Sequence, residues 1–147
     1  MATVKKSVLV PYSAAEMFSL VEKVDDYPSF LPWCAGVAHL PSAGAHPIVR
    51  VDIHYHGVFA HFTTENESFP PDRIVVALRD GPFRVLEGTW SFRALAENAC
   101  KVELELHYEF KTHVLEKVIG PVFGHIANTF IDAFVRRAES LHGNSTT

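Results

Sequence analysis

The sequence is poor in cysteine and lacks the short motifs of several common enzyme classes. Its two cysteines, Cys34 and Cys100, lie far apart and form neither a CxxC pair nor a Cys/His ligand spacing. Free thiols in a reducing compartment are the simpler interpretation of this pattern. The sequence has no phosphate-cradling glycine loop, no GxSxG and no HExxH. Nucleotide, serine-nucleophile and zinc-protease chemistry therefore lack support.

Long hydrophobic runs and a strong charge of one sign are lacking too. No stretch approaches the roughly 18 apolar residues of a membrane span, and the apolar run in residues 1–10 is too short for a signal peptide. We therefore expect a cytoplasmic protein without a transmembrane segment, and leave open a transient contact with a membrane surface. The formal net charge is -4, which makes free DNA a poor partner but leaves room for a local basic patch.

Aromatic residues, in contrast, are abundant. The 147 residues suffice for one domain with a substantial core, and we predict a single domain over residues 1–147. Eleven phenylalanines bring the aromatic content to 12%, which is rich for a globular protein. Much of this aromatic mass should line an interior.

The stretch Gly120–Gly143 carries the longest helical pattern. Apolar residues recur there at three- or four-residue steps, which predicts a helix with a buried stripe. Pro121 suits the first helical position, and Gly143 suits a stop after the helix. Such a stripe needs a large apolar surface opposite it.

Two short helical elements are expected near the start of the chain. Residues 3–10 resemble a strand, after which Ser13 and Glu16 have the spacing of a capping box. The amphipathic pattern that follows ends at Asp25 and Asp26. Residues 25–36 contain two prolines among large apolar groups, which indicates a second short helix or a packed bend.

From residue 37 onward the hydrophobic period is two, which predicts antiparallel strands. A two-residue turn at His56 and Gly57 would place Tyr55 opposite Val58 and Val51 opposite Phe62. The fold class is therefore α+β, a helix-grip in which a curved antiparallel sheet wraps around a long C-terminal helix. The expected strands are 37–40, 49–55, 58–69, 74–79, 86–93 and 102–110, with a loop at 41–47.

Such a grip can be hollow, and an apolar pocket is the usual form of a ligand site. Aromatic residues at strand and helix spacing are also what a plain, densely packed core contains. The pattern alone leaves both interpretations open.

Three stretches together resemble the bacterial coenzyme Q-binding, START-like family, also described as SRPBCC or polyketide cyclase/dehydrase-like. They are VPYSAAEMFSLVEKVDDYPSFLPWC (10–34), DGPFRVLEGTWSF (80–92) and GPVFGHIANTFIDAFVRRAESLHG (120–143). The family includes a ribosome-association toxin and proteins labelled oligoketide cyclases or lipid transport proteins. The resemblance implies a helix-grip fold around a hydrophobic cavity. It also implies binding of ubiquinone or another isoprenoid or lipid in support of respiratory quinone function.

The favoured function is non-catalytic binding of a hydrophobic small molecule such as ubiquinone, as a ligand rather than a cofactor. Most candidate residues of the cavity wall occupy positions that the periodicity predicts to point inward. Trp33 and Phe83 are included as aromatic loop residues expected near the opening of the cavity. The candidate ligand-binding residues are Trp33, Tyr55, Phe62, Phe83, Trp90, Phe92, Tyr108, Phe123, Ile126 and Phe130.

Two other function classes stay open. The first is association with the large ribosomal subunit that blocks subunit joining. Its candidate contacts to rRNA phosphate are also explained as solvated surface charges; they are Lys5, Lys6, Arg136 and Arg137. The second is a polyketide or oligoketide cyclase-like enzyme. Its support is thin because the inward positions hold few polar groups, mainly Tyr55, Thr64 and Tyr108, and we assign no catalytic residue.

One histidine cluster has the composition of a metal site. Asp52, His54, His56 and His61 come together in the predicted hairpin, and they could supply three or four ligands. The same register places them on the outer, solvated face, where an open sheet rarely closes a tetrahedral site. We predict no metal.

Overall fold

The computed structural model describes residues 2–42, 44 and 46–143. Its centre is a seven-stranded antiparallel sheet with the strand order β1-β7-β6-β5-β4-β3-β2. The strands are β1 (Ala2–Val10), β2 (Cys34–Leu40), β3 (Ile48–Tyr55), β4 (Val58–Phe69), β5 (Arg73–Asp80), β6 (Phe83–Ala96) and β7 (Ala99–Phe110).

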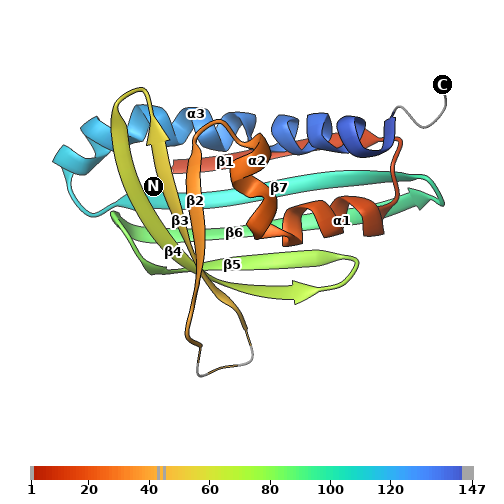
Figure 1. The fold of residues 1–147 in the computed structure, drawn as a ribbon, viewed down its shortest axis with the longest axis horizontal. Helices are drawn as coiled ribbons and strands as arrows, with labels where there is room; N and C mark the ends of the chain where they lie inside the picture. Colours follow the sequence, from red (N-terminus) through yellow and green to blue (C-terminus); the bar gives the residue numbers. More distant parts are fainter. Residues whose placement is uncertain (1, 43, 45, 144–147) are drawn as a thin grey trace.

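One long helix crosses the sheet, and two shorter helical elements follow β1. Figure 1 shows β1, β7, β6 and β5 running lengthwise beside the long helix α3, while β2, β3 and β4 turn steeply across them. The predicted helix-grip is confirmed. The helices are α1 (Ala14–Glu22), the 3-10 turn η1 (Val24–Asp26), α2 (Tyr27–Phe30), α3 (His113–Ala138) and the π-helical turn η2 (Glu139–Gly143).

The β3–β4 hairpin has the predicted register. Tyr55 pairs with Val58 and Val51 pairs with Phe62. His56 and Gly57 both have positive φ angles, 50° and 77°, as a two-residue type I′ turn requires. The loop that precedes β3 was expected at residues 41–47, of which 43 and 45 lie outside the described residues.

The capping box at the start of α1 is also confirmed. The Ser13 hydroxyl accepts from the Glu16 backbone N–H at 3.1 Å, and the Glu16 carboxylate accepts from the Ser13 backbone N–H at 3.1 Å. This backbone hydrogen bond lowers the pKa of Glu16. Two orphan donors at the helix start are thereby satisfied, which orients α1 against the sheet.

The predicted start of the long helix was wrong. The helix begins at His113 rather than near Gly120, because the Thr112 hydroxyl accepts from the Leu115 backbone N–H at 3.1 Å and caps it. Pro121 lies inside the helix. Its ring removes the bond to the carbonyl of Lys117, and both residues are exposed, so water can satisfy that carbonyl.

By length and composition, the segment His113–His142 would suffice to cross a membrane, with an 18-residue window of mean hydropathy 1.4. The sequence-based expectation of no transmembrane segment did not include this helix, because polar and charged residues interrupt its apolar ones. The core helix of a globular fold has the same properties because its buried face is apolar. In this fold 39% of that window is buried, and the buried face of α3 consists of Ile119, Phe123, Ile126, Ala127, Ile131, Phe134 and Ala138.

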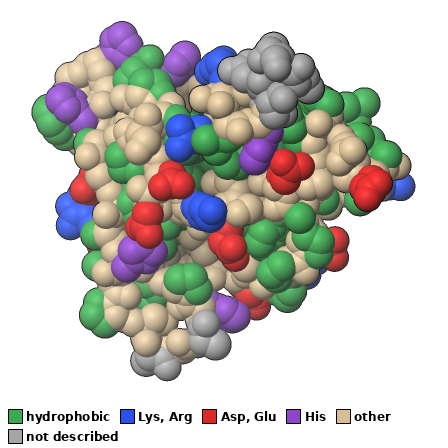
Figure 2. All heavy atoms as spheres, turned by 45° about the vertical axis from the view of Figure 1, so that its right-hand side comes forward, with side chains coloured by type: hydrophobic (Ala, Val, Ile, Leu, Met, Phe, Trp, Pro, Cys, Tyr) green, Lys and Arg blue, Asp and Glu red, His purple; other side chains and the backbone are tan. Residues whose placement is uncertain are grey.

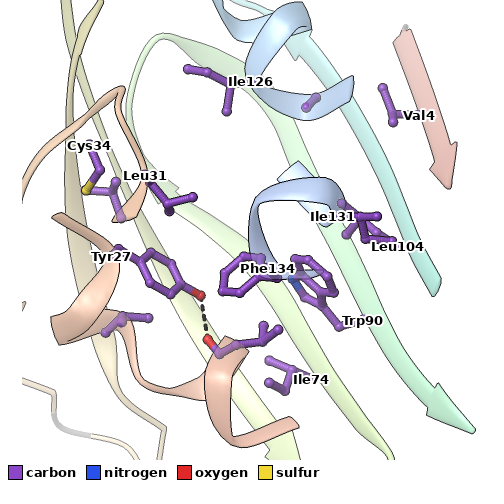
Figure 3. Close-up of a cluster of buried hydrophobic side chains, with 14 of the residues drawn as sticks. Val4, Tyr27, Leu31, Cys34, Ile74, Trp90, Leu104, Ile126, Ile131 and Phe134 are labelled. Carbon is purple, nitrogen blue, oxygen red and sulfur yellow. Dashed lines mark hydrogen bonds between the residues drawn. The ribbon is translucent and has the colours of Figure 1, made fainter. Parts of the chain in front are cut away.

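Two aromatic clusters fill the space between α3 and the sheet. In the first, Phe123 lies 4.8 Å from both Phe83 and Tyr108 between ring centroids. In the second, Phe134 lies 5.4 Å from Tyr27 and 5.3 Å from Trp90, and Figure 3 shows these three side chains converging from α2, α3 and β6. Phe123 of the first cluster and Tyr27 and Trp90 of the second also line a cavity beneath α3.

Candidate functional site

A cavity of about 100 Å³ lies between the two aromatic clusters. The concave side of the sheet forms most of its wall, α3 closes it, and Val24 of η1, Tyr27 of α2 and Trp33, which precedes β2, complete it. Its lining residues are Val24, Tyr27, Trp33, Val49, Val51, Phe62, Thr64, Asn66, Val76, Leu86, Gly88, Trp90, Leu104, Leu106, Phe123, Ile126, Ala127 and Phe130.

The wall is almost wholly apolar, with two polar side chains on β4. Thr64 is 3% exposed, and its hydroxyl donates to the side-chain carbonyl of Asn66 at 2.9 Å. Tyr27 is the titratable group among the described lining residues. Its hydroxyl donates to the backbone carbonyl of Val21, and burial raises the pKa of Tyr27. The site can therefore hold a neutral apolar molecule and offer it a few fixed dipoles.

The volume limits what enters without movement. An apolar protein cavity of about 150 Å³ accommodates benzene, so about 100 Å³ is too small for a substituted six-membered ring. The half-buried rings of Phe62 and Phe130 belong to the wall. A larger ligand therefore requires these rings to move, and both make contacts with neighbouring aromatic rings, such as Phe130 with Trp90 and Phe62 with Phe123.

A second hollow of about 100 Å³ adjoins the cavity and leads toward the surface. The two share Val24, Tyr27, Val49, Asn66, Val76 and Trp90, and the rim of the second hollow adds Glu22, His39, Pro47 and Ser68. The His39 imidazole lies 2.7 Å from the Asp25 carboxylate, which ties β2 to η1 beside this rim. Through this shared wall, the hollow connects the cavity with exposed residues such as Glu22 and His39.

Six of the ten predicted site residues line the cavity. They come from elements far apart in the sequence, and the fold brings them together around one space. They are Trp33, Phe62, Trp90, Phe123, Ile126 and Phe130. Trp33 is buried and does not lie at an exposed mouth as expected.

The other four predicted residues lie elsewhere. Phe83 is also buried rather than at a mouth, and it stacks on Phe110 at 4.9 Å. Phe92 packs against Phe18 of α1 at 5.6 Å. Tyr108 belongs to the first aromatic cluster, and Tyr55 stacks on His125 of α3 with the ring centroids 5.7 Å apart. The alternation of apolar residues predicts which side chains of a strand point inward. It does not distinguish those that line the cavity from those that pack in the core.

Sequence reasoning missed Asn66 and Tyr27. Asn66 lies two residues after Thr64 in the inward phase of β4, so the alternation contained a signal for it. Tyr27 lies in the stretch predicted as a second short helix or a packed bend, which the structure shows as the short helix α2, but nothing in the local pattern indicated that α2 forms part of the wall.

The predicted histidine cluster lies on the outer face of the hairpin. Asp52 accepts a hydrogen bond from Arg50 at 2.9 Å, and the His54 ring stacks on Phe59 with the centroids 3.9 Å apart. Within residues 2–42, 44 and 46–143, no three His, Cys, Asp or Glu side chains are arranged to hold a metal ion.

The curved sheet, the long helix it grips and the apolar cavity between them define a START-like helix-grip protein. The model of the family described as polyketide cyclase/dehydrase and lipid transport matches residues 10–135. The chain belongs to this family.

Relatives with full-length similarity have different names. The ribosome association toxin RatA of Vibrio cholerae is 42% identical over 143 residues, which cover 97% of this chain and 99% of the relative. The mitochondrial coenzyme Q-binding protein coq10 of Schizosaccharomyces pombe is 27% identical, with 94% and 87% covered. A START superfamily protein from Mycobacterium smegmatis has a solved structure with a TM-score of 0.74 and 26% identity, covering 95% of this chain and 98% of that one.

Proposed function

We propose that this protein binds a neutral hydrophobic small molecule, of the quinone or isoprenoid lipid class, in the cavity between the sheet and α3. The observation that carries the proposal is the composition of the wall, which is apolar apart from Thr64, Asn66 and the tyrosine hydroxyl of Tyr27. A cavity of this kind is the usual site for a hydrophobic ligand. The coq10 relative, named for coenzyme Q binding, supports the quinone class.

We propose further that the protein carries out no chemistry on this ligand and acts in the cytoplasm. General acid–base catalysis needs a titratable group that can reach the substrate with a useful pKa. The Tyr27 hydroxyl already donates a hydrogen bond to the Val21 carbonyl, and burial raises the pKa of Tyr27, so it is a poor acid or base at neutral pH. Of the activities in the family description, lipid transport therefore fits this chain better than cyclisation.

The chain provides its own probe for a binding test. Its two tryptophans, Trp33 and Trp90, both line the cavity, and a quinone close to an indole quenches its fluorescence. Titration with a decyl-substituted 1,4-benzoquinone should quench most of the tryptophan emission, in a saturable way. Native mass spectrometry should show one bound molecule. Weak, linear quenching without a bound mass would overturn the proposal.

Ribosome association is a second candidate function. The full-length 42% identity to the RatA relative favours it, and a protein that contacts rRNA needs cations that are free to reach phosphate. Such cations are lysines and arginines without a carboxylate partner. On the face shown in Figure 2, Lys and Arg side chains are interspersed with Asp and Glu.

Several outward-facing cations are already paired. The ammonium of Lys5, a predicted contact, lies 3.8 Å from the Glu105 carboxylate, and Arg137 lies over the Phe30 ring at 5.1 Å. Among the described residues, the predicted contacts Lys6 and Arg136 have no carboxylate partner, and neither have Arg93 and Lys101. Arg93 and Lys101 also face each other directly across β6 and β7. Like charges in such a pair repel, and an anionic partner would relieve that repulsion.

Sedimentation tests this second function. The parent protein should migrate with free large ribosomal subunits at low salt and dissociate as salt rises. Arg93→Glu with Lys101→Glu should abolish the association. Lys117→Glu, a change of an exposed lysine on α3, is the matched control and should have little effect. Parent protein that stays at the top of the gradient would contradict ribosome association.

A further inference from the structure

Asn66 lines both the cavity and the second hollow that adjoins it. Its side-chain carbonyl accepts the hydrogen bond from Thr64. Its amide nitrogen has no acceptor among the described residues. The half-buried Asn66 therefore presents two N–H donors to the space that a ligand would occupy.

Two indole N–H groups are further free donors in the wall. The indole N–H groups of Trp33 and Trp90 have no acceptor within the described part of the chain. The hydroxyl proton of Tyr27 is already donated to Val21. The described lining residues of the cavity include neither a carboxylate nor an ammonium or guanidinium group. The wall thus offers N–H donors without a net charge.

The side-chain oxygen of Asn66 has a structural role, because it accepts the hydrogen bond of the buried Thr64 hydroxyl, but the fold provides no such partner for the amide nitrogen. Asn66 pairs with Val76 of β5, and the surrounding wall includes Val49 and Trp90. An N–H group that leaves water without finding an acceptor costs about 1–3 kcal/mol. The presence of Asn66 is accounted for if a ligand supplies that acceptor.

We propose that Asn66 determines ligand specificity by donating a hydrogen bond to a carbonyl oxygen of a neutral ring compound. A quinone or cyclic ketone fits, since its oxygens only accept. A hydrocarbon of the same shape leaves the donors unpaired. A hydroquinone brings two hydroxyl protons, for which the described lining side chains offer only the remaining lone pairs on the oxygens of Thr64, Asn66 and Tyr27. This inference rests on the proposed function, since it requires a ligand in the cavity.

The test compares three probes of similar size on the full chain. A decyl-substituted 1,4-benzoquinone is titrated by tryptophan quenching, and its hydroquinone (under anaerobic reduction) and decylbenzene are measured as competitors. The parent should bind the quinone most tightly. Asn66→Leu should raise the Kd for the quinone about tenfold, the value of one hydrogen bond, and leave the Kd for decylbenzene unchanged.

The control is Asn98→Leu, the same change at an exposed position in the turn between β6 and β7, which should alter no Kd. If the parent binds the three probes equally, or if Asn66→Leu leaves the preference intact, the role of Asn66 is overturned while hydrophobic binding stands. If the parent binds no probe, the proposed function itself fails. If Asn66→Leu does not fold, Asn66→Asp makes the same comparison, because it keeps an oxygen to accept from Thr64 and removes the two N–H donors.

Discussion

The hydroxyl of Tyr27 in α2 donates a hydrogen bond to the backbone carbonyl of Val21, six residues earlier near the end of α1 (Figure 3). Helix ends leave carbonyls without an intrahelical partner, and this side chain supplies one. The ring of Tyr27 meanwhile packs against Phe134 at 5.4 Å. One residue therefore joins both short helices to α3 beside the cavity.

Tyr27→Phe should lower the free energy of unfolding by about 1–3 kcal/mol, because it leaves the Val21 carbonyl buried without its donor. Urea denaturation measures the change. Tyr12→Phe is the matched control, since the Tyr12 hydroxyl has no hydrogen-bond partner among the described residues. Equal stability of the two variants would show that the Tyr27 hydrogen bond contributes nothing.

Stability should fall in alkaline solution. Burial raises the pKa of Tyr27, Cys34 and Cys100, so the folded state keeps protons that the unfolded chain releases. The contribution of the thiols is complete below their ordinary pKa of about 8.5 and is lost as pH rises from there through the folded values, whereas that of Tyr27 is lost only above its ordinary pKa of about 10. The loss is about 1.4 kcal/mol per pH unit for each such group.

Urea unfolding under reducing conditions at pH 7.5, 9 and 10 measures this loss. Cys34→Ala with Cys100→Ala should flatten the curve between pH 8.5 and 10. A parent protein whose stability is constant over this range would contradict the assignment of buried, neutral thiols.

Phe130→Trp should reduce uptake of a decyl-quinone, because a larger ring at this wall position occupies space that the ligand needs. Phe130 lies between Trp33 and Trp90, at 5.7 and 5.5 Å from their ring centroids. Native mass spectrometry reports the bound fraction without using fluorescence. Phe59→Trp makes the same change at a side chain that is 73% exposed and should bind like the parent; uptake by Phe130→Trp at that level would remove Phe130 from the site.

Two glycine substitutions should have opposite effects. At Gly120, inside α3, a Cβ would meet Glu116 and Phe110 at ordinary distances of 3.7 and 3.8 Å, so Gly120→Ala should stabilise by about 0.5–1 kcal/mol. Gly81 has a φ of 144°, and a Cβ there would lie 2.9 Å from the Cβ of Phe62. Gly81→Ala should therefore destabilise by about 1–3 kcal/mol, as thermal unfolding of both variants would show.

The alternation of apolar residues was enough to predict most strands and the β3–β4 register. A one-residue slip would turn Val51 and Phe62 toward solvent, so the hydrophobic pattern and the turn at His56 and Gly57 permit one pairing. The capping box was predictable because it is local: Ser13 and Glu16 are only three residues apart. Local patterns failed at the start of α3, where the cap on Thr112 outweighed the signal from Pro121.

The sequence by itself determined which side chains face inward, because side-chain direction follows the period of each element. Only the tertiary structure decided which inward side chains border empty space. Phe92 and Trp90 share one face of β6, yet Phe92 packs against α1 while Trp90 lines the cavity. That difference arises from where α1, α2 and α3 cross the curved sheet. These crossings depend on contacts between residues such as Tyr27 and Phe134, which lie far apart in the chain and leave no periodic signal in it.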